Sequence, residues 1–265
     1  MIGAFIGDIA GSVFEFNNCK SKDIELMGGG CRFTDDSVMT AAVAAACLDY
    51  ANNRNIEDFE SGICRYMRLL GRKYIDAGYG GRFLKWLTSD DMGAYYSYGN
   101  GSAMRVSPVA YAARKLSEAE ILGEVSARVT HDHPEGIKGA RAVAAAVFMA
   151  LHGAPKEEIR AYIESGYYKI GFTLDEIRDM YTFDVSCQGS VPQALEAFFE
   201  AEGFEDAIRN AISIGGDSDT IACIAGSIAG AFFGVPDDLK NKALDFIAGT
   251  DLYAIYKDFC AKFAR

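Results

Sequence analysis

Acidic side chains gather at two points of the chain, each directly before an alanine-rich apolar run. Residues 34–37, Thr-Asp-Asp-Ser, precede the run 38–52, and residues 217–220, Asp-Ser-Asp-Thr, precede the run 221–234. Each group therefore carries two carboxylates and a threonine hydroxyl at the predicted start of a helix. Oxygen donors of this kind are the ligands that Mg²⁺ and Mn²⁺ prefer. The sequence predicts a metal centre assembled from both groups.

Helix capping explains part of the pattern more simply. Asp217 or Ser218 can occupy the N-cap, and an acid in the first turn gains about 0.3–1 kcal/mol from the helix dipole. Capping leaves a second aspartate and a threonine beside an apolar helix, where an unpaired carboxylate is costly to bury. No Lys or Arg lies between Arg209 and Lys240, so a bound cation is the expected partner. Five or six oxygen donors suit two ions about 3.5–4 Å apart.

Two more acids accompany the first predicted helix, residues 2–14. Glu15 follows this helix and precedes a polar loop, where a solvated carboxylate is the simpler interpretation. Asp8 lies within the helix, and its carboxylate is expected to hold a neighbouring loop by accepting backbone N–H groups.

The loop Gly99-Asn100-Gly101-Ser102 stands ahead of a predicted helix and offers backbone N–H groups to a phosphate. A flexible loop without a ligand is the alternative. The tyrosines beside it can stack on a base or a ribose, or form an ordinary surface cluster; they are Tyr95, Tyr96 and Tyr98.

Two of the three histidines, His131 and His133, lie in one loop. A His-x-His pair can bind Zn²⁺, but the same residues before Pro134 also make an ordinary helix start. A metal-dependent phosphohydrolase of the His-Asp class needs a further histidine upstream of His131, and the sequence has none there. That class is excluded.

The elements that must position these groups are predicted to be helical. Gly3, Gly7 and Gly11 share one face of the first helix, a pattern expected where two small-residue helices pack closely. Ser117 with Glu120 has capping-box spacing. No hairpin signal is present. The further helices are expected at 56–71, 82–87, 106–115, 135–152, 155–166, from 174, 191–201, 204–214 and twice in 238–265. The prediction is an all-α, compact multi-helix single domain over residues 1–265.

Composition narrows the classes of partner and compartment. Half of the 265 residues are hydrophobic and the net charge is −11, with scattered basic residues, which argues against nucleic-acid binding. The seven cysteines are isolated, so reduced thiols of a cytoplasmic protein are expected. No signal peptide is apparent, and the apolar run 220–235 is too short to span a bilayer. A monomer is the default expectation.

Taken in order, these motifs resemble those of the ADP-ribosylglycohydrolases, the all-α, dinuclear-metal family that includes the dinitrogenase reductase-activating glycohydrolase. The resemblance covers residues 2 to about 235, and the two aspartate motifs are its most specific part. The matching segments are 7–15, 33–37, 99–108, 130–135 and 215–220.

The resemblance implies a role for each matching residue. Glu15, Asp36 and Asp217 would serve catalysis, with Glu15 contacting the substrate ribose or a water. The loop 77–81 would border the site, and Asp76 beside it is a candidate base. The implied ligands of two Mg²⁺ or Mn²⁺ ions are Thr34, Asp35, Asp36, Asp217, Asp219 and Thr220. The implied contacts to the ADP-ribosyl group are Asn100, Gly101 and Ser102 at the diphosphate, together with His131 and Tyr98.

The implied activity is metal-dependent removal of ADP-ribose from a modified acceptor. ADP-ribosyl-arginine on protein is the favoured substrate, and a small-molecule ADP-ribose conjugate remains open. The same carboxylates would serve a two-metal phosphoesterase or nucleotide hydrolase. A catalytically silent ADP-ribose-binding protein is the third alternative, but such a protein should have lost ligand carboxylates, and here all four aspartates and both threonines are present.

Overall fold

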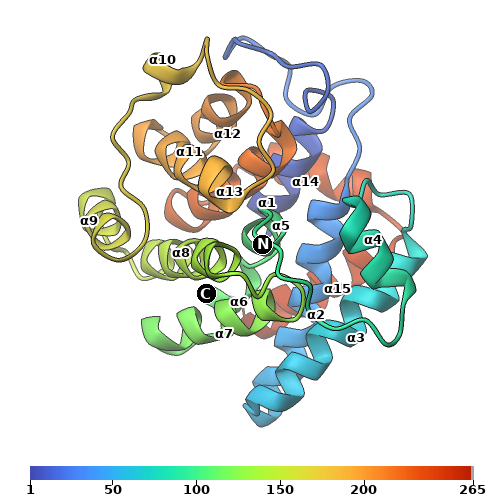
Figure 1. Cartoon of the computed structure of the whole chain (residues 1–265). Coiled ribbons are helices and arrows are strands. Elements are labelled where there is room, and N and C mark those ends of the chain that lie inside the picture. The colour runs from blue at the N-terminus through green and yellow to red at the C-terminus, as the bar shows by residue number, and fades with distance from the viewer. Residues whose placement is uncertain (264–265) are drawn as a thin grey trace.

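The computed structural model describes residues 1–263, and over that range the secondary structure is helical and contains no strand (Figure 1). This confirms the all-α class. The helices are α1 (Ile2–Gly11), α2 (Asp35–Asn53), α3 (Ile56–Lys73), α4 (Gly81–Thr88), α5 (Gly101–Met104), α6 (Pro108–Ala112), α7 (Leu116–Arg128), α8 (Pro134–Leu151), α9 (Lys156–Gly166), α10 (Leu174–Ile177), α11 (Cys187–Glu200), α12 (Phe204–Ser213), α13 (Ser218–Phe232), α14 (Asp237–Ile247) and α15 (Asp251–Phe263).

The first helix, α1, packs against α13 near the centre of the molecule, although the two are far apart in the sequence (Figure 1). Glycines permit this contact. A Cβ atom on Gly3 would lie 2.2 Å from the carbonyl oxygen of Gly226, and one on Gly11 would lie 2.4 Å from the Cα of Asp219. Only residues without a Cβ allow two backbones this close. The predicted small-residue packing is confirmed, and it brings α1 against the start of α13.

The starts of α2 and α13 both lie beside α1. Thr34 caps α2, and its side chain accepts a hydrogen bond from the N–H of Asp36 at 3.4 Å. Asp217 occupies the N-cap of α13, but its side chain makes no capping bond. Before it, Gly215 and Gly216 have φ angles of 69° and 75°, in the region that favours glycine. Capping therefore accounts for Thr34 but leaves the α13 carboxylates free for another role.

The remaining helices surround this centre (Figure 1). Helix α2 packs on α3 and α15, α7 packs on α8, and α8, α11 and α12 all contact α13. Within residues 1–263, no helix combines the length and the apolar character needed to cross a bilayer.

Helix α11 begins one turn earlier than the sequence pattern predicts. Its N-cap is Ser186, whose hydroxyl accepts the N–H of Gly189 at 3.1 Å, so the helix starts at Cys187 rather than at Val191. Pro192 lies inside the helix. The predicted start at residue 191 was wrong, because a serine cap further upstream determines where the helix begins.

The capping box predicted at Ser117 is also absent. Helix α7 starts after Lys115 without a side-chain cap. Glu120 instead accepts a hydrogen bond from the hydroxyl of Tyr162 at 2.8 Å and another from Tyr167. The Glu120 carboxylate therefore takes part in a tertiary contact rather than in the backbone cap that its spacing predicted.

Candidate metal centre and active site

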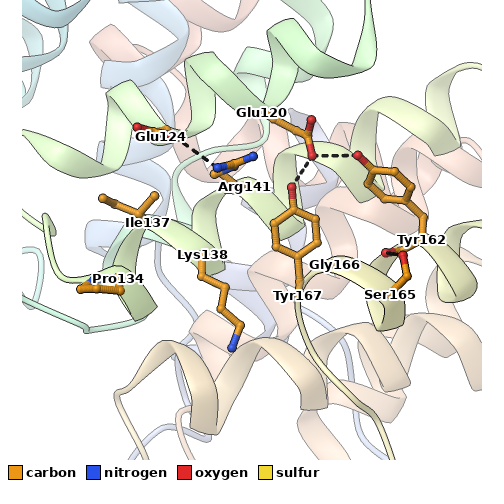
Figure 2. A pocket seen from close by; sticks show the side chains of 10 residues that line it. All are labelled: Glu120, Glu124, Pro134, Ile137, Lys138, Arg141, Tyr162, Ser165, Gly166 and Tyr167. Carbon is orange, nitrogen blue, oxygen red and sulfur yellow. Dashed lines mark hydrogen bonds and ion pairs between the residues drawn. The ribbon is translucent and has the colours of Figure 1, made fainter.

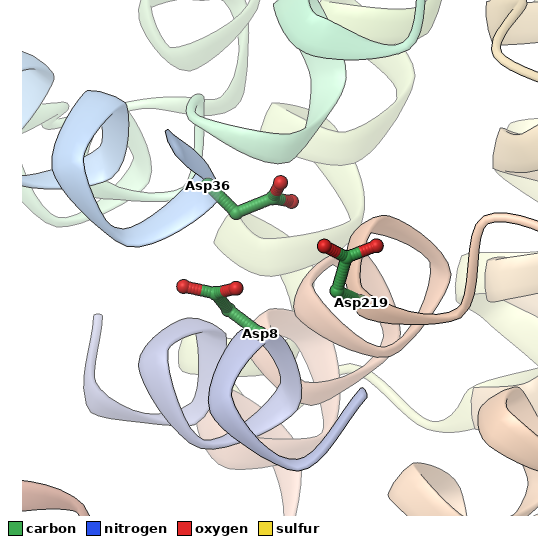
Figure 3. A group of neighbouring side chains, drawn as sticks. All are labelled: Asp8, Asp36 and Asp219. Atoms are coloured by element: carbon green, nitrogen blue, oxygen red, sulfur yellow. The ribbon is translucent and has the colours of Figure 1, made fainter. Parts of the chain in front are cut away.

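Carboxylates from three helices point toward one another where the starts of α2 and α13 meet α1 (Figure 3). Oxygens of Asp8, Asp36 and Asp219 all lie within 4.8 Å of one another. A second group, Glu15, Asp217 and Asp219, satisfies the same distance. Asp219 belongs to both, so the chain forms two adjacent acidic groups that share one carboxylate.

The described residues hold no ion pair that balances these acids, and the charge of Arg32 only partly offsets the raised pKa of Glu15. Within residues 1–263, none of the ion pairs involves any of the five carboxylates. Asp36 Oδ1 is buried and accepts no hydrogen bond in this described range. A buried, unpaired carboxylate oxygen is costly. The donor set is oxygen only, so the residues present fit a hard divalent cation.

Burial and mutual repulsion shift the pKa values of these groups upward. Burial is the main cause in each case, and repulsion from Asp219 adds to it for Asp36, whose pKa lies well above its usual range. The pKa of Asp219 is likewise well raised. The pKa of Asp217 rises to about 6 and that of Glu15, which is only half buried, to about 7. Without a cation, the site therefore retains protons at pH values where an ordinary carboxyl group is ionised.

Asp8 differs from the other acids because donors surround it. Its Oδ2 accepts the backbone N–H groups of Thr34 at 2.9 Å and Ser37 at 3.0 Å, together with the Ser37 hydroxyl. Its Oδ1 accepts the Thr34 hydroxyl at 2.6 Å. The prediction that Asp8 holds a neighbouring loop is confirmed. Its carboxylate fixes the first turn of α2, which carries the aspartates.

Both threonines of the two motifs lie within this cluster. The Thr34 hydroxyl is 3.5 Å from Asp219 Oδ2, and the Thr220 hydroxyl donates to Asp36 Oδ2 at 3.2 Å. Each hydroxyl therefore connects one motif to the other. The structure brings both motifs together, as the sequence predicts.

Asp35 lies outside both acidic groups and lines a cavity beside them. Its backbone N–H donates to the carbonyl of Ala77 at 2.9 Å, and Gly78 lies beside its carboxylate. The loop 77–81 thus borders the site. Asp76 is exposed and is absent from the cavity lining, so its position does not favour it as the base.

Besides Asp35, the acids that line this cavity of about 510 Å³ are Glu15, Asp36, Asp217 and Asp219, whereas Asp8 lies behind them outside the lining. The loop Gly99–Gly101 forms another part of its wall, and Phe16 and Phe183 stack at its edge with ring centroids 6.0 Å apart. Acidic groups, a glycine-rich loop and apolar rings therefore line one continuous space.

The glycine-rich loop uses its side chains differently from the expectation. Asn100 donates from Nδ2 to Asp217 Oδ2 at 2.6 Å and to the Ser190 hydroxyl at 3.0 Å. The Ser102 hydroxyl donates to the carbonyl of Gly136 at 2.7 Å and lies outside the cavity lining. Asn100 therefore orients an acid of the cluster, and Ser102 anchors the loop to α8.

His131 and Tyr98 have different environments. His131 is buried and lines the cavity, and its pKa lies well below the usual range because of burial, with the charges of Arg105 and Arg82 adding to the effect. Tyr98 is 50% exposed and packs edge-on against His133, with 5.2 Å between the ring centroids. The structure places Tyr98 beside this loop rather than in the cavity lining.

Sequence reasoning missed several residues of this site. Arg105 is buried and lines the cavity, and Ser190 supports Asn100. Arginine in the apolar stretch 103–113 was an available signal, since a buried guanidinium requires several acceptors. Ser190 had no such signal, because its partner comes from a distant segment.

A second cavity, of about 700 Å³, lies between α7, α8 and α9 (Figure 2). Its charged groups have partners in the protein: Glu120 accepts from Tyr162 and Tyr167, and Glu124 pairs with Arg141 at 3.5 Å. This cavity therefore shows no charge that calls for a ligand.

Comparisons with known proteins agree with the residues and the fold. A sequence model described as ADP-ribosylglycohydrolase matches residues 1–265. The chain is 29% identical to the ADP-ribosylarginine hydrolase Tri1 of Pseudomonas putida (strain GB-1), over 89% of this chain and 70% of that protein. It is 26% identical to the ADP-ribosylhydrolase ARH3 of Mus musculus, over 93% of this chain and 86% of that protein. A solved structure titled "ADP-ribosylglycohydrolase-related protein complex" superposes with a TM-score of 0.65 at 23% identity, covering 96% of both chains, and shows the shared fold.

Proposed function

The chain belongs to the ADP-ribosylglycohydrolase family, and from that premise we propose that it is a metal-dependent hydrolase that releases ADP-ribose from ADP-ribosyl-arginine on proteins. The observation that carries the metal dependence is the pair of largely buried acidic groups that share Asp219 and form no ion pair within the described residues. The arginine linkage is supported by the name of the relative from Pseudomonas putida. We further propose that residues 1–265 act as one domain. The seven free cysteines support a reducing compartment such as the cytoplasm.

Two divalent cations, Mg²⁺ or Mn²⁺, would complete the site. When bound, such ions supply Lewis acidity that orients the ribose hydroxyls and makes a water more acidic. The residues proposed to hold them are Thr34, Asp35, Asp36, Asp217, Asp219 and Thr220. Asp8 supports this set by fixing the first turn of α2, and the Asn100 amide keeps Asp217 in one orientation.

The proposed reaction replaces the bond between ribose C1″ and the guanidine nitrogen with a bond to a water oxygen. Such cleavage passes through an oxocarbenium-like state. Glu15 lies at the edge of the acidic cluster and is only half buried, and its pKa of about 7 suits a group that takes a proton from water at neutral pH. The leaving guanidine takes up a proton. Asp36 and Asp217 border the reacting centre and hold the water and the sugar in fixed relative positions.

The ADP-ribosyl group would extend from this centre along the glycine-rich loop. We propose that the loop of Asn100, Gly101 and Ser102 holds the diphosphate through the backbone N–H groups of Gly101 and Ser102, since the N–H of Asn100 donates to the carbonyl of Val185 at 2.7 Å. We also propose that His131 lies near a phosphate or the distal ribose. Asn100, Gly101 and His131 line the same cavity as the acids. Tyr98, at 50% exposure beside the loop, offers a ring face to the base.

The test is release of free ADP-ribose from an arginine-ADP-ribosylated protein with Mg²⁺, with Mn²⁺ and with EDTA, with Asp36→Ala as the control. We expect intact ADP-ribose, identified by mass, only with a metal and only with the wild-type side chain. Release of phosphate or a nucleotide instead would identify a phosphoesterase. Release from a serine-linked substrate alone would refute the arginine linkage, and binding of ADP-ribose without turnover of either substrate would indicate a silent binder.

A further inference from the structure

Arg105 is a buried guanidinium in the cavity wall, and the reaction proposed above gives it no role. It is 1% exposed and follows α5 directly. A buried cation is costly unless acceptors surround it. Its Nη2 donates to the carbonyl of Ser126 at 2.8 Å and to the hydroxyl of Thr130 at 2.9 Å. Among residues 1–263 it has no carboxylate partner. Arg105 is therefore directed toward the segment that carries His131.

The Thr130 hydroxyl connects Arg105 to the imidazole. It is fully buried and lies 2.7 Å from His131 Nδ1. Arginine can only donate, so the hydroxyl accepts from Arg105 and its own proton is left to donate. In the described range, Nδ1 is the one acceptor within hydrogen-bond distance of that hydroxyl. A proton directed at Nδ1 requires this nitrogen to be unprotonated, and a neutral imidazole then carries its proton on Nε2.

The other ring nitrogen faces the glycine-rich loop. A Cβ atom on Gly99 would lie 3.4 Å from His131 Nε2, and one on Gly101 would lie 3.3 Å from it. Both glycines and His131 line the cavity. The Nε2–H group thus lies at the part of the wall where the diphosphate is proposed to bind. Its environment includes Arg105, Arg82 and the Tyr95 ring, with no carboxylate among the contacts found in residues 1–263.

We propose that Arg105 and Thr130 are positioning residues that fix His131 in its Nε2–H form, so that the wall beside Gly99 and Gly101 presents one fixed, uncharged donor to an oxygen of the bound ADP-ribosyl group. The ligand named here rests on the proposed function. The hydrogen-bond chain itself belongs to the ligand-free protein. A donor set in advance loses no freedom on binding, and its neutrality keeps the two arginines free of a third adjacent positive charge.

The direct test is ¹⁵N NMR of the histidine rings in ligand-free protein, where the two neutral forms give distinct proton–nitrogen correlation patterns. His133→Gln and His152→Gln assign the other two rings. We expect wild-type His131 to show a protonated Nε2 and a bare Nδ1. A protonated Nδ1, or a charged ring at neutral pH, would overturn the proposal.

Two variants test the positioning role. Thr130→Val removes the hydroxyl at similar volume, and Arg105→Met removes the donor behind it, so each should give a mixture of ring forms. By calorimetry with Mg²⁺ present, Thr130→Val should bind ADP-ribose about tenfold more weakly, whereas Thr130→Ser, which keeps the hydroxyl, should stay within about twofold of wild type. Unchanged ring form and unchanged affinity in Thr130→Val would overturn the proposal.

The outcomes separate this inference from the proposed function. A protein with the expected ring form and the expected variant effects on ADP-ribose binding, but without hydrolysis of ADP-ribosyl-arginine, would refute the function and leave the positioning intact. If neither variant folds, the wild-type spectrum still decides the ring form.

Discussion

The cavity between α7, α8 and α9 has a volume of about 700 Å³ and holds two acids and two bases, whereas the cavity at the starts of α2 and α13 has about 510 Å³ and holds five acids and two arginines. In the first cavity the acids have tyrosine or arginine partners. In the second, both arginines instead donate to backbone carbonyls, Arg82 to Tyr95 and Arg105 to Ser126. The charged side chains of the larger cavity therefore balance one another, whereas the carboxylates of the smaller cavity are not paired with its arginines.

The difference shows that cavity size says less about function than the balance of charge within it. Bringing carboxylates together in a buried place lowers the free energy of unfolding unless a cation or protons offset their repulsion. The α1–α13 glycine contact brings Asp8 and Asp219 together without a base, so the arrangement is stable only with protons or a cation. Substitutions and conditions that change this balance of charge should have effects that decrease from Asp219 to Glu120.

Asp219→Asn should have the largest effect, because Asp219 is common to both acidic groups. Loss of a shared ligand should lower kcat/KM by a factor on the order of a thousand. In EDTA the same variant should unfold a few degrees above wild type, because one repelling carboxylate is removed while the amide oxygen still accepts the N–H of Thr220. Activity assays and thermal unfolding check both effects. A Tm in EDTA below that of the wild type would show that Asp219 does not repel the neighbouring acids.

The metal-free protein should lose stability as the pH rises. The pKa values of Asp217 and Glu15 are raised to about 6 and about 7, mainly by burial. Acids with raised pKa values bind more protons in the folded state than in the unfolded state, whose values are about 4. The free energy of unfolding therefore falls between about pH 4 and pH 7. In EDTA, we expect the Tm to be roughly 5 °C lower at about pH 7.5 than at about pH 5.

Adding Mg²⁺ or Mn²⁺ should reverse this slope, since the ions favour ionised ligands and bind more tightly as protons leave. A Tm in EDTA that increases over the same pH interval would show that the acids have other partners.

Asp8→Ala should destabilise the protein, in contrast to Asp219→Asn. It removes the acceptor of two backbone N–H groups and two hydroxyls, at a cost of about 2–4 kcal/mol in EDTA. Asp8→Asn should cost less, because its amide oxygen can still face the N–H groups of Thr34 and Ser37. Urea unfolding of both variants checks the order. A stabilising Asp8→Ala would place Asp8 with the repelling acids rather than with the residues that fix α2.

Glu120→Gln, in the balanced cavity, should have the smallest effect. The amide oxygen can still accept from Tyr162 and Tyr167, so the stability should change by less than about 1 kcal/mol and hydrolysis should be unaffected. Urea unfolding and the release assay check this variant. A large loss of activity would give this cavity a role that its pairing of charges does not indicate.

The two aspartate motifs and the glycine-rich first helix could be predicted because each is a local signal. Residue spacing placed Asp36 and Asp219 at helix starts, and the small residues of α1 required a close neighbour. The structure brings these parts together through the contacts of Gly3 and Gly11 with α13.

The directions of side chains in the loops could not be predicted in the same way. Asn100 and Ser102 are adjacent to Gly101, yet one donates to an acid of the cluster and the other to the backbone of α8. Their partners come from distant segments, which a single sequence does not place. The same reason explains Glu120. Its spacing predicted a capping box, but its carboxylate accepts hydrogen bonds from Tyr162 and Tyr167, which come from another part of the chain.

If the unpaired carboxylates mark a site for two cations, anomalous diffraction from a crystal soaked in Mn²⁺ should locate the ions there. We expect two anomalous peaks per chain among the proposed ligands, Thr34, Asp35, Asp36, Asp217, Asp219 and Thr220, with Asp219 close to both. Glu120 and Glu124 in the balanced cavity should show none. Absence of both peaks from the acidic groups, at Mn²⁺ concentrations that support hydrolysis, would contradict the account.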